Sequence, residues 1–152
     1  MVGLSLAIVG VSMALVQVLL IGRLVARYGE RTTALIGLSV ALMGQIYYIF
    51  GSSGVIALLI CTINGLQGMV MPSLNAMMSR RTPANQQGEL QGFNGSLAAL
   101  AALIAPLIYN TTLSHYSSLE AGAQFVGAPF VISASLVLIA IVSLARLKRA
   151  NQ

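Results

Sequence analysis

Five long apolar runs, separated by short polar stretches, constrain this chain more than any other feature of its sequence. They cover about residues 2–21, 33–50, 55–78, 90–112 and 125–144. A helix of about 20 mostly apolar residues crosses a bilayer core, and each run is close to that length. Hydrophobic residues make up 57% of the 152 residues and charged residues only 7%, more apolar surface than a soluble domain of this size buries. The sequence therefore predicts an all-α, polytopic α-helical membrane protein with about five transmembrane helices.

The basic residues lie in three clusters, and every cluster follows an odd-numbered apolar run. The clusters are Arg23, Arg27 and Arg31; Arg80 and Arg81; and Arg146, Lys148 and Arg149. Because Lys and Arg concentrate in cytoplasmic loops, this distribution predicts an N-terminus outside the cell and a cytoplasmic C-terminus. No basic stripe interleaves with aromatic residues as a nucleic-acid-binding face would require, so we expect no nucleic-acid partner.

The titratable residues are too few and too scattered for an enzyme site. Cys61 and His115 are the only residues of their types, and we expect His115 to be solvated in a loop over residues 113–124. No glycine-rich loop with a lysine is present to bind phosphate. The sequence thus predicts no catalytic residue, no metal and no cofactor.

The three carboxylates also avoid the middle of the apolar runs. Glu30 and Glu89 lie next to basic clusters, and Glu120 lies on the opposite side. A proton-coupled transporter needs a titrating group inside the membrane, so we expect the coupling residue to lie outside this chain. For Glu89 we expect either an ion pair with Arg80 or Arg81, or simple solvation.

The polar stretch between the first two runs, GRLVARYGERT at residues 22–32, carries a distinctive pattern. Its two glycines permit tight turns. Arg27 and Arg31 can reach the carbonyls at helix C-termini or a carboxylate on a neighbouring helix, and Glu30 can pair with Arg27 if the segment is helical. Two interpretations follow from these residues: a plain solvated loop, or a structured loop that latches two helices.

This stretch resembles the loop motif of the major facilitator superfamily, roughly G-x-x-x-D-R-x-G-R-R. Ala26 stands where the motif has Asp, and Glu30 stands where it has Arg; both departures are typical of the weaker copy in the second half of that fold. The residues assigned to this cytoplasmic loop motif are Gly22, Arg23, Arg27, Gly29, Glu30 and Arg31.

Three further stretches resemble tetracycline-efflux-type transporters, in the drug:proton antiporter branch of that superfamily. They are MPSLNAMMSRRTPANQQGELQG (71–92), AALIAPLIY (101–109) and VGAPFVISASLVLIAI (126–141). The resemblance implies that residues 1–152 form most of the C-terminal half of a major facilitator fold, helices eight to twelve of twelve. It also implies a missing N-terminal half, from the same gene or a separate chain, and a bacterial cytoplasmic (inner) membrane.

The resemblance further implies which residues face the substrate. The third run would line the central cavity and the first and fourth would flank it, with helix packing as the alternative role for every polar residue. The substrate-cavity candidates are Gln17, Asn64, Gln67, Met69, Met71 and Asn94. The candidates for helix packing and gating are Pro72, Gln87, Gly88, Gln91, Gly92 and Pro106.

Together these features predict part of a secondary active multidrug or tetracycline-like efflux transporter. The intact protein would exchange a small hydrophobic drug for protons by alternating access, with the lipid bilayer and the missing half as its partners. The alternative is a stand-alone, truncated small membrane protein without transport activity of its own.

Overall fold

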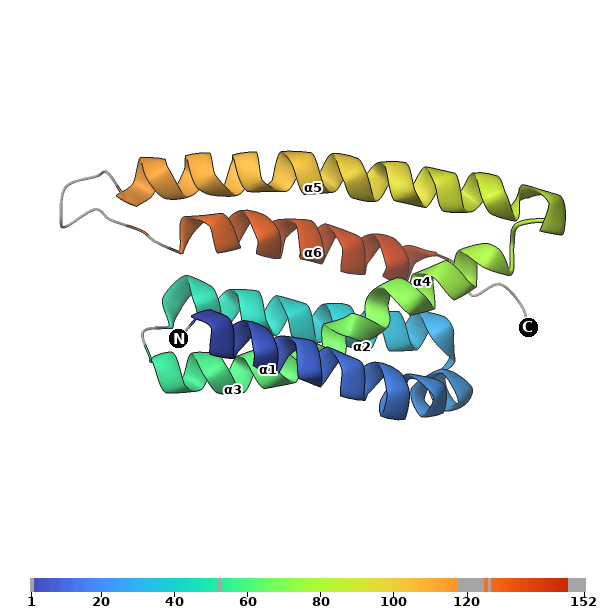
Figure 1. Ribbon diagram of the computed structural model, residues 1–152, viewed down its shortest axis with the longest axis horizontal. Helices are drawn as coiled ribbons and strands as arrows, with labels where there is room; N and C mark the ends of the chain where they lie inside the picture. Colours follow the sequence, from blue (N-terminus) through green and yellow to red (C-terminus); the bar gives the residue numbers. More distant parts are fainter. Residues whose placement is uncertain (1, 52, 118–124, 126, 148–152) are drawn as a thin grey trace.

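The computed structural model describes residues 2–51, 53–117, 125 and 127–147, and nearly all of them are helical (Figure 1). No strand occurs among these residues, so the prediction of an all-α fold is confirmed. The elements are α1 (Val2–Leu15), the π-helical η1 (Val16–Leu20), α2 (Ile21–Phe50), α3 (Gly54–Asn64), the 3-10 helix η2 (Gly65–Met69), α4 (Val70–Ser79), the 3-10 helix η3 (Ala84–Gln86), α5 (Gln87–Ser117) and α6 (Ala128–Arg146).

Four continuous helical stretches are long and apolar enough to cross a membrane. They are Val9–Phe50, Gly54–Ser79, Ala84–Ser117 and Ala128–Arg146. The first of these reverses its direction partway, so that its two parts run side by side in opposite directions (Figure 1). Antiparallel helices of membrane-spanning length are the polytopic arrangement that the apolar runs predicted; their exact number of crossings stays a prediction.

The reversal occurs at a single residue, Gly29, whose φ of 79° and ψ of 162° lie outside the helical region. Only glycine adopts such a conformation without steric cost. Residues 21–28 form the first arm of α2 and residues 30–50 its second arm. The prediction of a loop over residues 22–32 was therefore wrong in detail, because the segment is helical up to Gly29 and again directly after it.

The helix of the fourth apolar run is also longer than expected, since α5 ends at Ser117 rather than near residue 112. No glycine or proline interrupts residues 107–117, so nothing stops the helix at the edge of the apolar run. His115 consequently lies in α5, and its ring contacts Tyr116 edge-on at a centroid distance of 5.3 Å. The expectation of a loop histidine was wrong. Glu120 lies outside the described residues.

The second arm of α2 is the centre of the bundle and packs against α4, η2 and α6. Its buried residues are Thr33, Ala34, Gly37, Ala41 and Gly44. These residues follow the spacing of one helix face, and all are small, which lets neighbouring backbones approach closely. A Cβ atom at Gly37 would lie 2.7 Å from Val70 Cγ2 and 3.2 Å from the Leu66 carbonyl.

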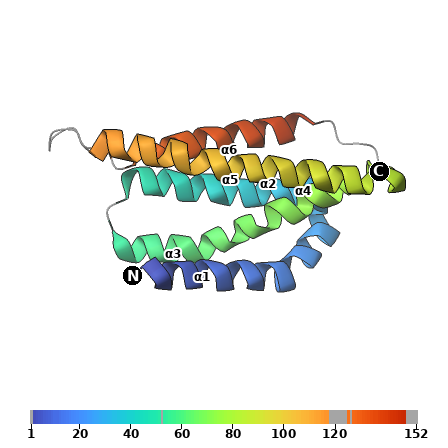
Figure 2. The same ribbon diagram turned by 45° about the horizontal axis from the view of Figure 1, so that its top comes forward.

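The outside of the bundle is apolar. Helix α5 has no buried residue at all, and it lies beside α6, away from α1 and α3 (Figures 1 and 2). Large side chains such as Leu103, Leu107 and Leu136 are more than half exposed. A helix that is apolar on every side belongs in lipid or inside a larger protein, which agrees with an integral membrane protein.

Candidate functional site

The first two basic clusters and Arg146 of the third lie at one end of the bundle, which we call the arginine-rich end (Figure 1). There Arg31 lies in the first turn of the second arm of α2 and reaches across to the C-terminus of α6. Its Nε donates to the Leu144 carbonyl at 3.1 Å, and its Nη2 donates to the Ala145 carbonyl at 2.6 Å. The last carbonyls of a helix lack intrahelical partners and carry partial negative charge. Arg31 thus makes the kind of contact that the sequence suggested for it.

The preceding residue, Glu30, forms an ion pair with a residue next to α4. Its Oε1 lies 3.0 Å from Arg80 Nε, just beyond the C-terminus of α4. The Glu30 side chain is 12% exposed, whereas that of Arg80 is 76% exposed. We call Glu30, Arg31 and Arg80 the latch, because they tie the start of the second arm of α2 to α4 and α6.

This ion pair corrects one expectation from the sequence and bears on a second, for which two alternatives were open. Glu30 does not pair with Arg27, since the chain reverses at Gly29 and leaves Arg27 on the first arm, with its guanidinium 5.4 Å from the Tyr28 ring centroid. Arg80 pairs with Glu30, and Glu89 is exposed on α5, which agrees with simple solvation, the second of the two alternatives for Glu89. Lys148 and Arg149 of the last cluster lie outside the described residues.

The helix of the third run changes its geometry near its middle, where the 3-10 helix η2 joins α3 to α4. Pro72 has no N–H, so it cannot donate to the Gly68 carbonyl four residues earlier. Gln17, within the π-helical η1, places its Nε2 3.5 Å from that carbonyl. The backbones also meet closely here, since a Cβ at Gly65 would lie 2.5 Å from Ser12 Cβ. Two irregular helical segments, of the kind often found at functional sites, therefore face each other.

The remaining cavity candidates have different surroundings. Asn64 lies against Gly44 of α2, and Gln67 is half-buried. Met69 is completely buried, whereas Met71 is 57% exposed. Asn94 donates through Nδ2 to Oδ1 of Asn75 at 3.2 Å, which links α5 to α4. A shared role of these residues in a substrate cavity stays a prediction.

Among the packing candidates, Gln87 has the clearest structural role. Its Nε2 donates to the carbonyls of Ser79 at 2.9 Å and Thr82 at 2.8 Å, and its Oε1 accepts from Ser79 Oγ at 3.0 Å. The side chain thus satisfies one carbonyl at the end of α4 and one just beyond it, and fixes the connection to α5. The other candidates on α5 are exposed, namely Gly88, Gln91, Gly92 and Pro106.

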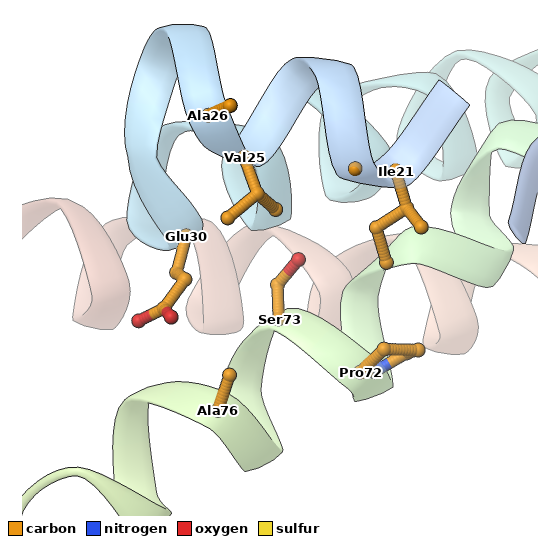
Figure 3. A pocket seen from close by; sticks show the side chains of 8 residues that line it. Ile21, Val25, Ala26, Glu30, Pro72, Ser73 and Ala76 are labelled. Carbon is orange, nitrogen blue, oxygen red and sulfur yellow. The ribbon is translucent and has the colours of Figure 1, made fainter. Parts of the chain in front are cut away.

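A cavity that the sequence did not predict lies beside the latch, between the first arm of α2 and α4 (Figure 3). It has a volume of about 340 Å³, and its lining consists of Ile21, Gly22, Val25, Ala26, Glu30, Pro72, Ser73 and Ala76. Ser73 Oγ is buried and has no hydrogen-bond partner. Ser73 and Ala76 carried no signal in the sequence, because small residues in an apolar run are equally typical of packing.

Comparison with known proteins decides the family. The sequence profile described as Major Facilitator Superfamily matches residues 1–151. The chain belongs to the major facilitator superfamily. The resemblance seen in the loop motif is thereby confirmed, and membership of this transporter superfamily agrees with the prediction that the chain is not an enzyme.

The similar proteins in this superfamily include several tetracycline resistance proteins. The class C protein of Escherichia coli is 31% identical over 96% of this chain, and the class G protein of Vibrio anguillarum is 36% identical over 95%. The rat Hippocampus abundant transcript-like protein 1 is 26% identical over 88%. The chain spans 36% of the length of each of the two tetracycline resistance proteins. No solved structure gives a significant match.

Proposed function

We propose that this chain is the C-terminal part of a secondary active efflux transporter, equivalent to helices eight to twelve of the major facilitator fold. The observation that carries the proposal is the match to tetracycline resistance proteins along nearly the whole chain, at 36% of their length. The intact transporter would export a small hydrophobic drug, of the tetracycline or a broader multidrug class, in exchange for protons. The arginine-rich end faces the cytoplasm in this proposal, and the membrane is the bacterial inner membrane.

The surroundings of α5 support a missing partner. No residue of α5 is buried, and a Cβ at Gly88 or Gly92 would meet nothing within 4 Å. Small residues one turn apart in a membrane helix are typical of a face against which another helix packs. In our proposal this face packs against the N-terminal half of the transporter, which also supplies the membrane-embedded carboxylate for proton coupling.

The latch supports rigid movement of this part of the protein. Arg31 and Glu30 tie the second arm of α2 to α6 and α4 at one end of the bundle. Alternating access in such transporters requires one helical bundle to rock against the other. We propose that the latch keeps these helices together during that movement, while the contact between Gln17 and Gly68 marks the place where the first and third helices bend.

A complementation experiment tests the proposal. The chain is co-expressed in Escherichia coli with a fragment of the class C tetracycline resistance protein that lacks the matching part, and tetracycline accumulation is measured. The two pieces together should lower accumulation, whereas either piece alone should not. Replacement of Arg31 by Met should weaken the effect of the pair.

Two results would contradict parts of this proposal. Lowered accumulation with this chain alone would show that proton coupling does not depend on a missing half. No effect of the pair, although both pieces are membrane-inserted, would favour the alternative of a stand-alone membrane protein without transport activity.

A further inference from the structure

We propose that the cavity between the first arm of α2 and α4 is a binding site for a small lipophilic amine in its ammonium form. The inference goes beyond the proposed function, because it concerns a site formed by this chain alone at the arginine-rich end. It rests on three features of the cavity: a hydroxyl without a hydrogen-bond partner, a carboxylate paired only with an exposed arginine, and apolar walls (Figure 3).

The hydroxyl belongs to Ser73, which is 1% exposed. Its Oγ has no hydrogen-bond partner and is directed toward the space below Val25 (Figure 3). Other helical serines of the chain, among them Ser39, Ser96 and Ser135, donate to the carbonyl four residues earlier. For Ser73 that carbonyl belongs to Met69, within the 3-10 segment η2, where the helical register changes. Because buried hydroxyls normally have a partner, this one points to a polar group in the cavity.

The carboxylate belongs to Glu30, which lies at one end of the cavity (Figure 3). Glu30 is largely buried, but its partner Arg80 is 76% exposed and does not line the cavity. An exposed arginine holds a carboxylate only weakly, because water and salt compete for it. A cation in the cavity can therefore also contact the Glu30 carboxylate and compete with Arg80 for it.

The walls determine the rest of the ligand. Ile21, Val25, Ala26, Pro72 and Ala76 present hydrocarbon, and Gly22 adds no side chain. A volume of about 340 Å³ lies at the lower end of the range for small-molecule sites. This space suits one ring or a short alkyl chain that ends in an ammonium group. An inorganic cation would leave the apolar walls unused, and an anion would face Glu30.

The test is a titration of the full chain in lipid nanodiscs with para-fluorobenzylamine, followed by fluorine NMR. Empty nanodiscs report the partition of the probe into lipid, and para-fluorobenzyl alcohol serves as an uncharged ligand of the same shape. We expect saturable binding of the amine above the lipid background, and binding of the alcohol weaker by about tenfold, the loss expected for one charge-assisted contact.

Four variants separate this site from a purely structural role of the same residues. Ala26→Leu adds a side chain to the cavity wall and leaves the latch residues unchanged. Glu30→Gln removes the negative charge. Each variant should lower the affinity for the amine by about tenfold or more. Arg80→Gln removes the competing guanidinium and should strengthen binding a few-fold. Glu89→Gln makes the same charge change as Glu30→Gln on exposed α5 and should leave binding unchanged. Circular dichroism monitors folding in each case.

The opposite effects of the Glu30 and Arg80 variants are decisive. If both weaken binding, the ion pair has only a structural role and the proposed site is wrong. Equal binding of amine and alcohol, or saturable binding that survives Ala26→Leu, would also overturn the proposal. The absence of saturable amine binding above the lipid background would overturn it as well.

Discussion

The second arm of α2 and helix α5 share two features of composition but have very different surroundings. Both are long and apolar, and both carry small residues at helical spacing, Gly37 and Gly44 in one and Gly88 and Gly92 in the other. In α2 these residues are buried against α3, η2 and α4, whereas no residue of α5 is buried. A stripe of small residues therefore identifies a packing face, but not whether this chain supplies the helix that covers it.

The largest expected effect comes from replacing one glycine in each helix by leucine. Gly37→Leu would force a side chain against Val70 Cγ2 and the Leu66 carbonyl, and overpacking of this kind costs about 1–3 kcal/mol. Gly92→Leu, which meets open space, should change stability by less than about 0.5 kcal/mol. Unfolding by SDS in mixed micelles measures both. Equal losses would show that α5 is also covered, for example by a second copy of the chain.

The transport experiment extends the test of Gly92→Leu to the intact transporter. With the fragment of the class C tetracycline resistance protein present, Gly92→Leu should impair tetracycline export even though the isolated chain tolerates it. Unimpaired export would show that this face of α5 does not contact the missing half.

A medium effect is expected from the latch, which fixes α2 but not α5. Arg31→Met removes two hydrogen bonds from a charged group to the α6 carbonyls, and we expect a loss of about 1.5 kcal/mol in the free energy of unfolding. The matched control is Arg27→Met, because Arg27 contacts only its neighbour Tyr28 among the interactions described above. A similar loss in both variants would mean that positive charge, rather than the contact with α6, matters at this end.

The smallest effect is expected where α5 touches the rest of the bundle through side chains. Asn94→Leu breaks the hydrogen bond to Asn75, and such bonds between membrane helices contribute about 0.6 kcal/mol on average. A double-mutant cycle with Asn75→Leu should reveal this coupling. Gln91→Leu, on an exposed part of the same helix, is the control; coupling of equal size there would make the Asn94 contact unimportant.

The sequence by itself determined the membrane class, the helical fold and the superfamily. Apolar runs of bilayer length leave helices as the natural solution, since every backbone group must be bonded within the membrane. The spacing of glycines and arginines around residues 22–32 was enough to show the family resemblance. For Arg31 the sequence also named helix C-terminal carbonyls as one of two kinds of partner, and the structure shows that contact.

Only the tertiary structure decided which partner each residue takes. Glu30 and Arg27 are three residues apart, as in a helical ion pair, yet the positive φ of Gly29 separates them and turns Glu30 toward Arg80, fifty residues further along the chain. The Gly68 carbonyl, to which Pro72 cannot donate, likewise accepts from a side chain far away in the sequence, that of Gln17. The cavity at Ser73 also depends on how the first arm of α2 and α4 lie against each other (Figure 3). Local composition sets what a residue can bind, and the direction of each helix sets what it meets.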